Sequence, residues 1–403
     1  MSKYLASRVG YFPESVIRLM SQLAAKYRAV NLAQGSPDFN PPREVLDAAK
    51  QALDAGYNQY AIAWGSPRLR QALAERVRKY NNIEIDPETE VVVTCGTTEG
   101  MVASILSLVE PGEEVVVFEP FYENYVPDTL LAGGVPRFVE LKPPSFAVDE
   151  EELKNAFTNK TKLVILNNPN NPSGKVFTCE ELKLIRDLCI DYDVIAIVDE
   201  VYEYIIYDGL KHISLASLDG MFERTLTISG ISKTYNATGW RVGWVIGEQG
   251  LLEGVKKIHE FLTVGAPNPL QEAAATALSL PDEYYRWLVE QYNKRRMVML
   301  RVLGENGFKY YKPQAAYFVL ADITEFGFED DSSFAEFLVR EVGVAVVPGS
   351  SFYHDGWRKD IVRFQFARHL DILEEAGRRL ARLSSLKGRE NQRCGELAEC
   401  RKS

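Results

Sequence analysis

Lys233 lies in a segment whose residue types suit covalent chemistry on an aldehyde. It comes shortly after a strand-like run, 225–229, directly behind Ser232 and before the polar segment 234–236, a setting that predicts a crowded polar pocket. Burial near another cation lowers the pKa of a lysine, so that part of it is neutral and can form an imine. Arg241, eight residues further on, offers a charged fork that suits phosphate oxygens.

A carboxylate and two hydrogen-bonding groups supply what such an aldehyde needs if it carries a pyridine ring. Asp199 ends the apolar run 194–198, which is typical of a buried parallel strand, and ligands gather at the carboxyl ends of such strands. There a carboxylate keeps a pyridine nitrogen protonated and strengthens the pull of the ring on electrons. Tyr202 and Asn171 can hydrogen-bond a phenolic oxygen. Together these are the requirements of pyridoxal 5′-phosphate (PLP).

A glycine turn predicts the phosphate site. Gly96 stands between a strand-like run, 90–94, and a helix-like pattern that begins at Thr98. It lets the backbone approach an anion, and the amides of Gly96, Thr97 and Thr98 then point at that anion from the start of the helix. Ser232 adds a hydroxyl group, and the ring of Tyr122 can stack on the cofactor.

Each of these features also has a purely structural interpretation. A lone lysine is usually a solvated surface charge, and an aspartate at a strand end is as often a helix cap. The segment NPSG at 171–174 is an ordinary turn signature. The occurrence of all these features in one chain, in this order, favours a cofactor site over coincidence.

Seven short segments resemble the class I/II aminotransferases of the aspartate aminotransferase superfamily, which have the fold-type-I PLP architecture. The resemblance extends from about Arg8 to about Arg382. The segments that carry it are NLAQGSPDF (31–39), NQY (58–60), NNPNNPSG (167–174), VDEVY (198–202), SK (232–233), TGWRVG (238–243) and IVRFQFA (361–367).

The resemblance implies a role for each of these residues. The catalytic residues would be Lys233, which binds the cofactor as a Schiff base and moves the proton, Asp199, which pairs with the pyridinium nitrogen, and Tyr202. Arg363 would grip the substrate carboxylate, for which a bidentate guanidinium is suited, with Asn171 and Gly35 beside it. The cofactor-binding residues would be Gly96, Thr97, Thr98, Tyr122, Asn171, Asp199, Tyr202, Ser232, Lys233 and Arg241, with Tyr60 reaching in from the neighbouring subunit of a homodimer.

Departures from the family pattern bear on the cofactor and the substrate. Gly230 replaces a frequent serine, which removes one phosphate hydroxyl. Segment 261–268 lacks the extra arginine that aspartate-specific relatives use, and kynurenine- and glutamine-type relatives carry an aromatic residue where this chain has Glu14 or Thr98. We expect a neutral, apolar or aromatic amino donor. The aromatic residues that could line the pocket for its side chain are Tyr11, Phe12, Trp64, Phe352 and Tyr353.

The order of the elements indicates an α/β protein. Strand and helix patterns alternate through the middle of the chain, which is typical of a mostly parallel sheet with helices on both faces; the resemblance implies seven strands. After residue 281 a long helix and mixed elements indicate a smaller α+β domain. We expect an N-terminal arm packing with the small domain (1–40), a large PLP-binding domain (41–280), a small C-terminal domain (281–385) and a polar, disordered tail (386–403).

Composition narrows the possible partners and location. A net charge of −10 over 403 residues disfavours nucleic acid or an anionic membrane as the main partner. No apolar run approaches the ~20 residues that span a bilayer, and the N terminus lacks a signal-peptide core, so we expect a cytoplasmic protein. The 5 cysteines and 4 histidines have no metal-binding or disulfide spacing, so no metal is expected.

Several functions stay open on the sequence alone. The leading one is a PLP-dependent aminotransferase that moves the amino group of an L-amino acid to a 2-oxo acid by a ping-pong mechanism. A PLP-dependent lyase, acting by β-elimination or a related reaction, is the alternative, because PLP stabilises the same carbanion and the protein decides its fate. A non-catalytic regulator is disfavoured by the presence of Lys233, Asp199 and Arg363, and a nicotinamide dehydrogenase by the absence of GxGxxG.

Overall fold

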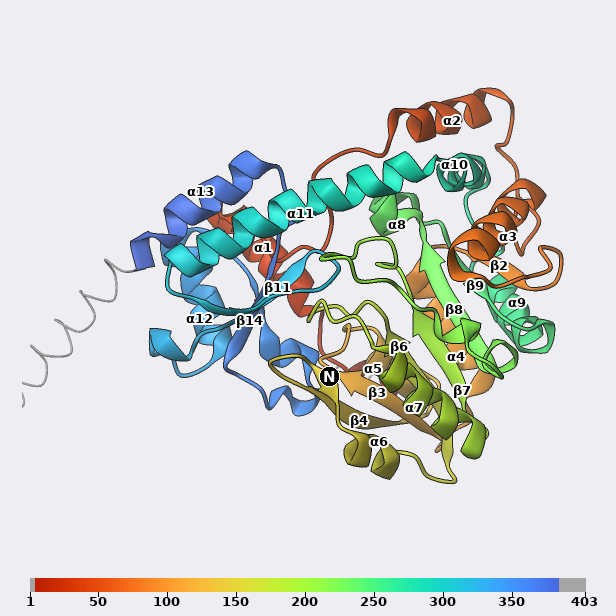
Figure 1. The fold of residues 1–403 in the computed structure, drawn as a ribbon, viewed down its shortest axis with the longest axis horizontal. Helices are drawn as coiled ribbons and strands as arrows, with labels where there is room; N and C mark the ends of the chain where they lie inside the picture. The colour runs from red at the N-terminus through yellow and green to blue at the C-terminus, as the bar shows by residue number, and fades with distance from the viewer. Residues whose placement is uncertain (1–3, 384–403) are drawn as a thin grey trace, which may run out of the picture. The chain divides into compact units, whose positions relative to one another are not determined.

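The structure is a computed structural model that describes residues 4–383 (Figure 1). Contacts within the chain divide these residues into two compact units, each of which is described by itself. The described residues of unit 1 are 4–13, 39–290 and 314–316, and those of unit 2 are 14–38, 291–313 and 317–383. The four-part domain division stays a prediction, and its tail, 386–403, lies outside the described residues.

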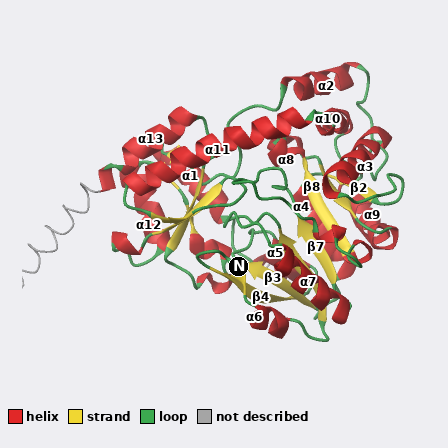
Figure 2. Ribbon diagram, viewed as in Figure 1, coloured by secondary structure: helices red, strands yellow, loops and turns green. Residues whose placement is uncertain are grey.

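Unit 1 is built on a mixed sheet with helices on both faces (Figure 2), which confirms the predicted α/β fold class. The central strands are buried along nearly their whole length, so they form almost continuous apolar runs rather than an alternating pattern. The spatial order of the strands is β2 (Val91–Thr94), β9 (Gly243–Ile246), β8 (Thr225–Gly230), β7 (Ile195–Asp199), β6 (Thr161–Asn167), β3 (Glu114–Glu119), β4 (Val135–Lys142) and β5 (Ala147–Val148).

The strand directions are mostly parallel, as expected. Strands β8, β7, β6, β3 and β4 run parallel, whereas β9 is antiparallel to both of its neighbours. The sheet has eight strands instead of the expected seven, because the two-residue β5 pairs with the end of β4. Two prolines, Pro143 and Pro144, follow β4 and cannot donate to a ladder, so the chain turns back there.

Alternate residues of the sheet enter two separate cores. On one face, Val91 and Val93 of β2 pack in a cluster with residues from α2 (Arg43–Asp54), α3 (Pro67–Asn81) and α10 (Asn268–Leu278). Val92 points the other way, into a cluster formed with helices that include α4 (Thr97–Leu108) and α9 (Gln249–Thr263). Because successive side chains of a strand point to opposite faces of the sheet, apolar residues on both faces pack against helices. The remaining α-helices that lie wholly within unit 1 are α5 (Tyr125–Leu131), α6 (Glu150–Ala156), α7 (Cys179–Asp191) and α8 (Ile231–Thr234).

Unit 2 combines an antiparallel sheet with helices. Its four-stranded sheet has the order β10 (Lys309–Tyr311), β11 (Phe318–Asp322), β14 (Ile361–Gln365) and β13 (Val347–Pro348). A separate pair joins β1 (Val30–Asn31) in parallel to β12 (Val344–Ala345). The helices of this unit are α1 (Val16–Tyr27), α12 (Asp331–Phe337) and α13 (Leu370–Leu380), and the long helix α11 (Asp282–Glu305) has residues in both units. Within residues 4–383, no helix is both long and apolar enough to cross a membrane.

Candidate active site

Asp199 is a buried carboxylate at the carboxyl end of β7. Its Oδ2 accepts a hydrogen bond of 2.8 Å from the hydroxyl of Tyr125, and its Oδ1 accepts one of 3.3 Å from the amide of Val201. Burial raises the pKa of Asp199 to about 6, against the opposing effects of these two hydrogen bonds and of the charge of Lys233. A protonated ring nitrogen would replace the lost hydration of this carboxylate and lower its pKa again.

Asn167, at the end of the neighbouring strand β6, is hydrogen-bonded to Asp199. The register of β6 and β7 places Asn167 opposite Asp199. Its side-chain nitrogen donates to the carbonyl of Asp199 over 2.9 Å, and its Oδ1 accepts from the amide of Asn171 over 2.6 Å. One side chain thus fixes Asp199 relative to the loop that carries Asn171, so two predicted site residues are brought together.

Lys233 lies in α8, which follows directly on β8, the strand beside β7. Its Nζ is 5.9 Å from the ring centroid of Tyr202, and Tyr202 is buried in the turn that follows β7. Because β7 and β8 run parallel, their carboxyl ends place Lys233 and Asp199 at the same edge of the sheet. The amine and the carboxylate therefore frame a site of the kind predicted.

Gly96 forms a close-packed turn at the start of α4. Its φ of 79° and ψ of 168° lie in a region that is essentially restricted to glycine. A Cβ at this position would lie 2.1 Å from Nη2 of Arg241. Arg241 itself adopts a left-handed conformation, with φ 55°, and its Nη1 donates to the carbonyl of Thr238 over 2.9 Å. The backbone geometry holds the guanidinium against the glycine turn.

The residues around this turn fit a phosphate group. Ser232 is buried, and its Oγ has no hydrogen-bond partner among the described residues. The first residues of α4 are Thr97 and Thr98, and the first amides of a helix have no acceptor within that helix. A buried hydroxyl, a guanidinium and helix-terminal amides are the donors that a phosphate dianion requires.

Tyr122 packs beside the residue that contacts Asp199. Its half-buried ring lies 5.8 Å from that of Tyr125, at an interplanar angle of 74°. This places Tyr122 next to the carboxylate edge of the site, where its predicted stacking role is sterically reasonable. Tyr60, by contrast, is 84% exposed and is not brought together with these residues within one chain. Its predicted role concerns a neighbouring subunit and stays a prediction.

Arg363 and Gly35 belong to unit 2. Arg363 lies on β14 and is fully buried, with the rings of Phe318 and Phe352 at 4.3 and 5.0 Å from its guanidinium carbon and the carbonyl of Ala33 accepting from Nη2 over 2.8 Å. The carbonyl of Gly35 accepts from the hydroxyl of Tyr317 over 2.9 Å. This arginine is a desolvated cation held in a fixed orientation, which suits it to a carboxylate ligand.

Sequence reasoning missed Tyr125 and Asn167. Tyr125 stands three residues after Tyr122, and Asn167 is the first residue of the recognised segment 167–174. The spacing from Tyr122 could have placed both tyrosines on one side of a helical turn. For Asn167, the signal was its position at the end of a strand adjacent to that of Asp199.

Comparisons with known proteins identify the family of this chain. The family model "Aminotransferase class I and II" matches residues 27–376. The solved structure of N-succinyldiaminopimelate aminotransferase from Mycobacterium tuberculosis is 40% identical, with a TM-score of 0.91, over 94% of this chain and 100% of that chain. Kynurenine–oxoglutarate transaminase of Dictyostelium discoideum is 37% identical over 92% of this chain and 94% of that protein. Aspartate aminotransferase of Pyrococcus abyssi is 38% identical over 94% of this chain and 98% of that protein.

The family match covers most of the chain, and the relatives align with it over nearly their whole length. The predicted activity, an amino-group transfer to a 2-oxo acid, and the predicted cofactor, PLP, are confirmed at the level of the family. The chain belongs to the class I and II aminotransferases, and it is a PLP-dependent enzyme of the fold-type-I architecture.

Proposed function

We propose a specific division of labour among the site residues. When bound, PLP supplies an aldehyde that takes up the amino group and a ring that withdraws electrons from the substrate Cα. Asp199 pairs with the ring nitrogen, and the amine of Lys233 holds the cofactor and then moves the proton at Cα. The phosphate is held by Gly96, Thr97, Thr98, Ser232 and Arg241, while Tyr202 and Asn171 hydrogen-bond the phenolic oxygen and Tyr122 stacks on the ring.

One observation carries this assignment. A buried carboxylate ends β7, and a half-buried lysine lies in the helix that directly follows the adjacent parallel strand β8, beside a glycine turn that no other residue type fits without strain. Lys233→Ala is expected to abolish turnover while the circular dichroism spectrum stays that of the wild type. Lys257→Ala, which removes an exposed lysine of α9, serves as the matched control. Wild-type turnover in Lys233→Ala would refute the assignment.

We propose that Arg363 binds the α-carboxylate of the substrate and that Gly35 and Asn171 assist. The support is the burial of its guanidinium between two aromatic rings, which removes water from the cation and so strengthens its attraction to a carboxylate. An arginine held in this way offers two parallel donors to one planar anion.

We propose a neutral, apolar or aromatic amino donor and 2-oxoglutarate as acceptor. Segment 261–268 contains no arginine for a distal carboxylate, and one similar enzyme is named for kynurenine and oxoglutarate. The names of two other relatives, an N-succinyldiaminopimelate and an aspartate aminotransferase, make donors with a distal carboxylate the second candidate. The values of kcat/KM for phenylalanine, methionine, kynurenine, aspartate and N-succinyldiaminopimelate decide between them; a preference for the acidic donors would overturn the first proposal.

We propose that the enzyme is a homodimer. Tyr60 is 84% exposed and Phe261 is 91% exposed. A hydrogen bond of 2.8 Å between Nε2 of His259 and the carbonyl oxygen of Ala63 joins α9, which carries Phe261, to the segment that carries Tyr60. Large exposed apolar side chains are typical of an interface, and in a dimer they would be covered by the second copy, whose site receives Tyr60.

Subunit mixing tests the dimer and the role of Tyr60 together. Tyr60→Ala and Lys233→Ala are each expected to be nearly inactive as homodimers. In a mixed dimer the intact Lys233 of one subunit meets the intact Tyr60 of the other, so activity should return after the two variants are unfolded and refolded together. A monomer in light scattering, or no recovery in mixed dimers, would contradict the proposal. The cytoplasmic location also stays a prediction, which cell fractionation would test.

A further inference from the structure

Two carboxylates and an imidazole, none of them assigned to PLP, converge inside unit 1. Glu200 and Glu203 lie in the turn after β7, and His212 lies in the loop that follows. One ligand atom from each lies within 4.8 Å of the other two. The side chains of Glu200 and His212 are each 1% exposed, and Glu203 is 7% exposed. The sequence spacing matches no metal motif, because the loop of residues 204–211 separates ligands that only the fold brings together.

A second histidine shows what a satisfied buried pair looks like in the same protein. Nδ1 of His259 lies 3.0 Å from Oε2 of Glu99, and its Nε2 lies 2.8 Å from the carbonyl oxygen of Ala63, both as hydrogen bonds. Nε2 of His212 also lies 3.0 Å from a carboxylate oxygen, that of Glu200, but its Nδ1 has no hydrogen-bond partner among residues 4–383. One ring nitrogen of His212 thus lacks the partner that both ring nitrogens of His259 have.

A small cavity with further unsatisfied oxygens adjoins this cluster. Glu200, Glu203, Ser214 and Thr227 are among the residues that line a cavity of about 20 Å³, which is room for one water molecule or one ion. Among the residues that the structure describes, Oγ of Ser214, a residue that is 2% exposed, has no hydrogen-bond partner, and neither has Oγ1 of Thr227 or Oε1 of Glu200. Buried polar atoms in native proteins nearly always have partners, so these oxygens indicate a small ligand.

The charges of the cluster favour a cation over a water molecule. The carboxylates of Glu200 and Glu203 are both buried, and each supplies a ligand atom to the same cluster. Two carboxylates held together away from water repel each other, and a divalent ion offsets that repulsion where a neutral water does not.

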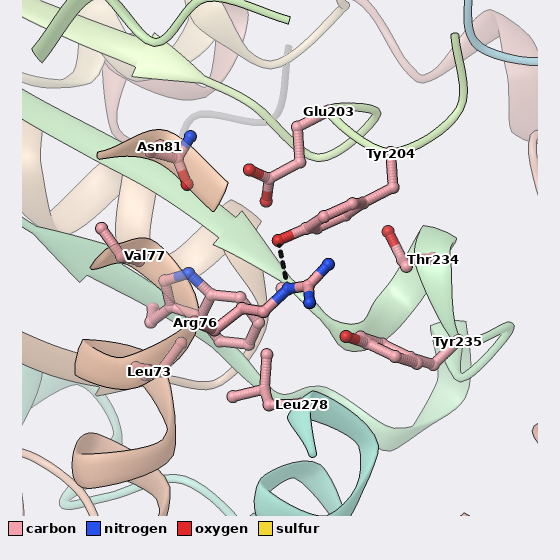
Figure 3. Close-up of a pocket in the computed structure, with 11 residues that line it drawn as sticks. Leu73, Arg76, Val77, Asn81, Glu203, Tyr204, Thr234, Tyr235 and Leu278 are labelled. Atoms are coloured by element: carbon pink, nitrogen blue, oxygen red, sulfur yellow. Dashed lines mark hydrogen bonds between the residues drawn. The ribbon is translucent and has the colours of Figure 1, made fainter. Parts of the chain in front are cut away.

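The nearest arginine on the other side of Glu203 is already engaged. Figure 3 shows Glu203 beside Arg76 and Tyr204, with the hydrogen bond of 2.9 Å from Nε of Arg76 to the hydroxyl of Tyr204. Nη1 of Arg76 also lies 3.5 Å from a carboxylate oxygen of Asp282, and its guanidinium carbon stands 3.8 Å from the ring centroid of Tyr285. Arg76 is therefore held in place by other groups rather than directed at the cluster.

We propose that Glu200, Glu203 and His212 bind one divalent cation of the zinc class, with the hydroxyl of Ser214 beside it. An imidazole and two carboxylates are a donor set that Zn²⁺ accepts, at ~2.1 Å from each ligand atom. At such metal–ligand distances, two ligand atoms of a tetrahedral site lie ~3.4 Å apart. The three ligand atoms of this cluster now lie within 4.8 Å of one another, so side-chain movements of about 1 Å would bring them to that separation. The site shares no ligand with the proposed PLP site, and the bound cation stabilises the turn that follows Asp199.

The surroundings orient these ligands. Oγ of Ser229 donates to Oε1 of Glu203 over 3.0 Å, and the ring of Tyr80 stacks parallel to that of His212, with centroids 6.4 Å apart. The hydroxyl of Tyr80 also donates to the carbonyl of Glu203 over 2.8 Å. Partners that fix the orientation of ligands are what metal sites require beyond the ligands themselves.

Metal analysis of the PLP-loaded full chain tests the proposal. The protein is purified without chelators, dialysed against Zn²⁺ at pH 8 and then against buffer, and measured by inductively coupled plasma mass spectrometry. We expect about one zinc per chain, a melting temperature several degrees above that of the metal-free protein, and an anomalous diffraction peak at the zinc edge between Glu200, Glu203 and His212.

Variants separate this site from surface binding. Glu203→Gln and His212→Gln should lose the bound zinc and the rise in melting temperature, whereas His259→Gln, which alters the satisfied histidine, should keep both. If the first two variants fail to fold, Ser214→Ala should weaken zinc binding several-fold while leaving the ligands in place. The proposal is overturned if the wild type retains no zinc, if the anomalous peak lies only at other residues, or if a water molecule occupies the cavity after zinc dialysis.

Discussion

At the scale of single residues, we propose that Asp199 is the group that keeps the cofactor ring nitrogen protonated. Its buried carboxylate accepts from the Tyr125 hydroxyl over 2.8 Å, so it is held in one orientation. Asp199→Asn keeps the shape and removes the charge, and we expect proton removal at Cα to slow by several orders of magnitude. Tyr125→Phe removes only the supporting hydrogen bond, worth about 1.5–3 kcal/mol, so its rate should fall by no more than about 100-fold.

Single-turnover kinetics measure both effects, with the rate followed by cofactor absorbance. The order of the two variants is the informative result, because it separates the charge from the contact that positions it. If Tyr125→Phe were slower than Asp199→Asn, the ring nitrogen would have a partner other than Asp199.

A substitution at Arg363 tests whether the two parallel donors of the guanidinium, and not only its charge, contribute to substrate binding. Arg363→Lys preserves the cation but loses the two parallel donors that match a carboxylate. We expect KM for the amino donor to rise about 10- to 100-fold, which corresponds to the loss of about one charge-assisted hydrogen bond, with retention of PLP. Arg378→Lys, on the exposed face of α13, is the control, and an unchanged KM in Arg363→Lys would move the carboxylate site to another residue.

At the scale of elements, the turn from β2 into α4 is the feature most dependent on one residue type. Gly96→Ala would place a Cβ 2.1 Å from Nη2 of Arg241, in a backbone conformation that is essentially restricted to glycine. We expect PLP affinity to fall at least 10-fold, since the same change displaces the guanidinium and strains the backbone by about 1–3 kcal/mol. Gly239→Ala has open space at its Cβ and should bind PLP as the wild type does. Equilibrium dialysis with PLP measures both, and equal affinities would contradict a phosphate site here.

Helix α5 contains a carboxyl group that makes stability depend on pH. Burial raises the pKa of Asp128 from 3.8 to about 7, and within the described part of the chain its Oδ2 has no hydrogen-bond partner. Because this pKa is higher in the folded chain than in the unfolded one, the folded state holds the proton more tightly. The stability linked to that proton is complete below pH 3.8 and is lost as the pH rises through 7.

Asp128→Asn should therefore stabilise the protein increasingly between pH 4 and pH 8, by at most about 4 kcal/mol. Chemical unfolding at several pH values measures the difference from the wild type. Asp191→Asn, at the exposed end of α7, should show no comparable trend. A constant difference for Asp128→Asn across this range would mean that Asp128 is ionised when folded.

The elements show which features of the fold could be predicted from the sequence. The apolar runs that end near Thr94, Asp199 and Gly230 predicted strands, and the structure ends β2, β7 and β8 at these residues. These strands could be predicted because both faces of the sheet are buried, so that the strands appear in the sequence as nearly continuous apolar runs. The two-residue β5 has no such signal, since its pairing with β4, rather than its own composition, makes it a strand.

At the scale of the whole molecule, the parts of the site that were missed depend on long-range packing. Local segments identified Lys233, Gly96 and Arg241, because turns and loops carry their own residue signatures. The contact of Tyr125 with Asp199 spans 74 residues, and the convergence of Glu200, Glu203 and His212 requires a loop to fold back. Such contacts are set by the register of the sheet, which a single sequence does not state.

The identity of the amino donor is also a property of the whole molecule. The family match and the relatives establish amino-group transfer, but their names include both aromatic and acidic substrates. Side-chain pockets differ by a few residues on one fold, so fold and activity class are shared where substrates are not.

The central claim is that this chain transfers an amino group through its bound cofactor in two separable halves. The most direct measurement is the visible spectrum of the PLP-loaded enzyme, to which single amino acids are added in the absence of a 2-oxo acid. We expect the absorption band of the bound cofactor to disappear with a suitable donor and to return when 2-oxoglutarate is added, with release of the matching oxo acid. A band that persists with every donor, or the release of ammonia without any need for an oxo acid, would contradict the account.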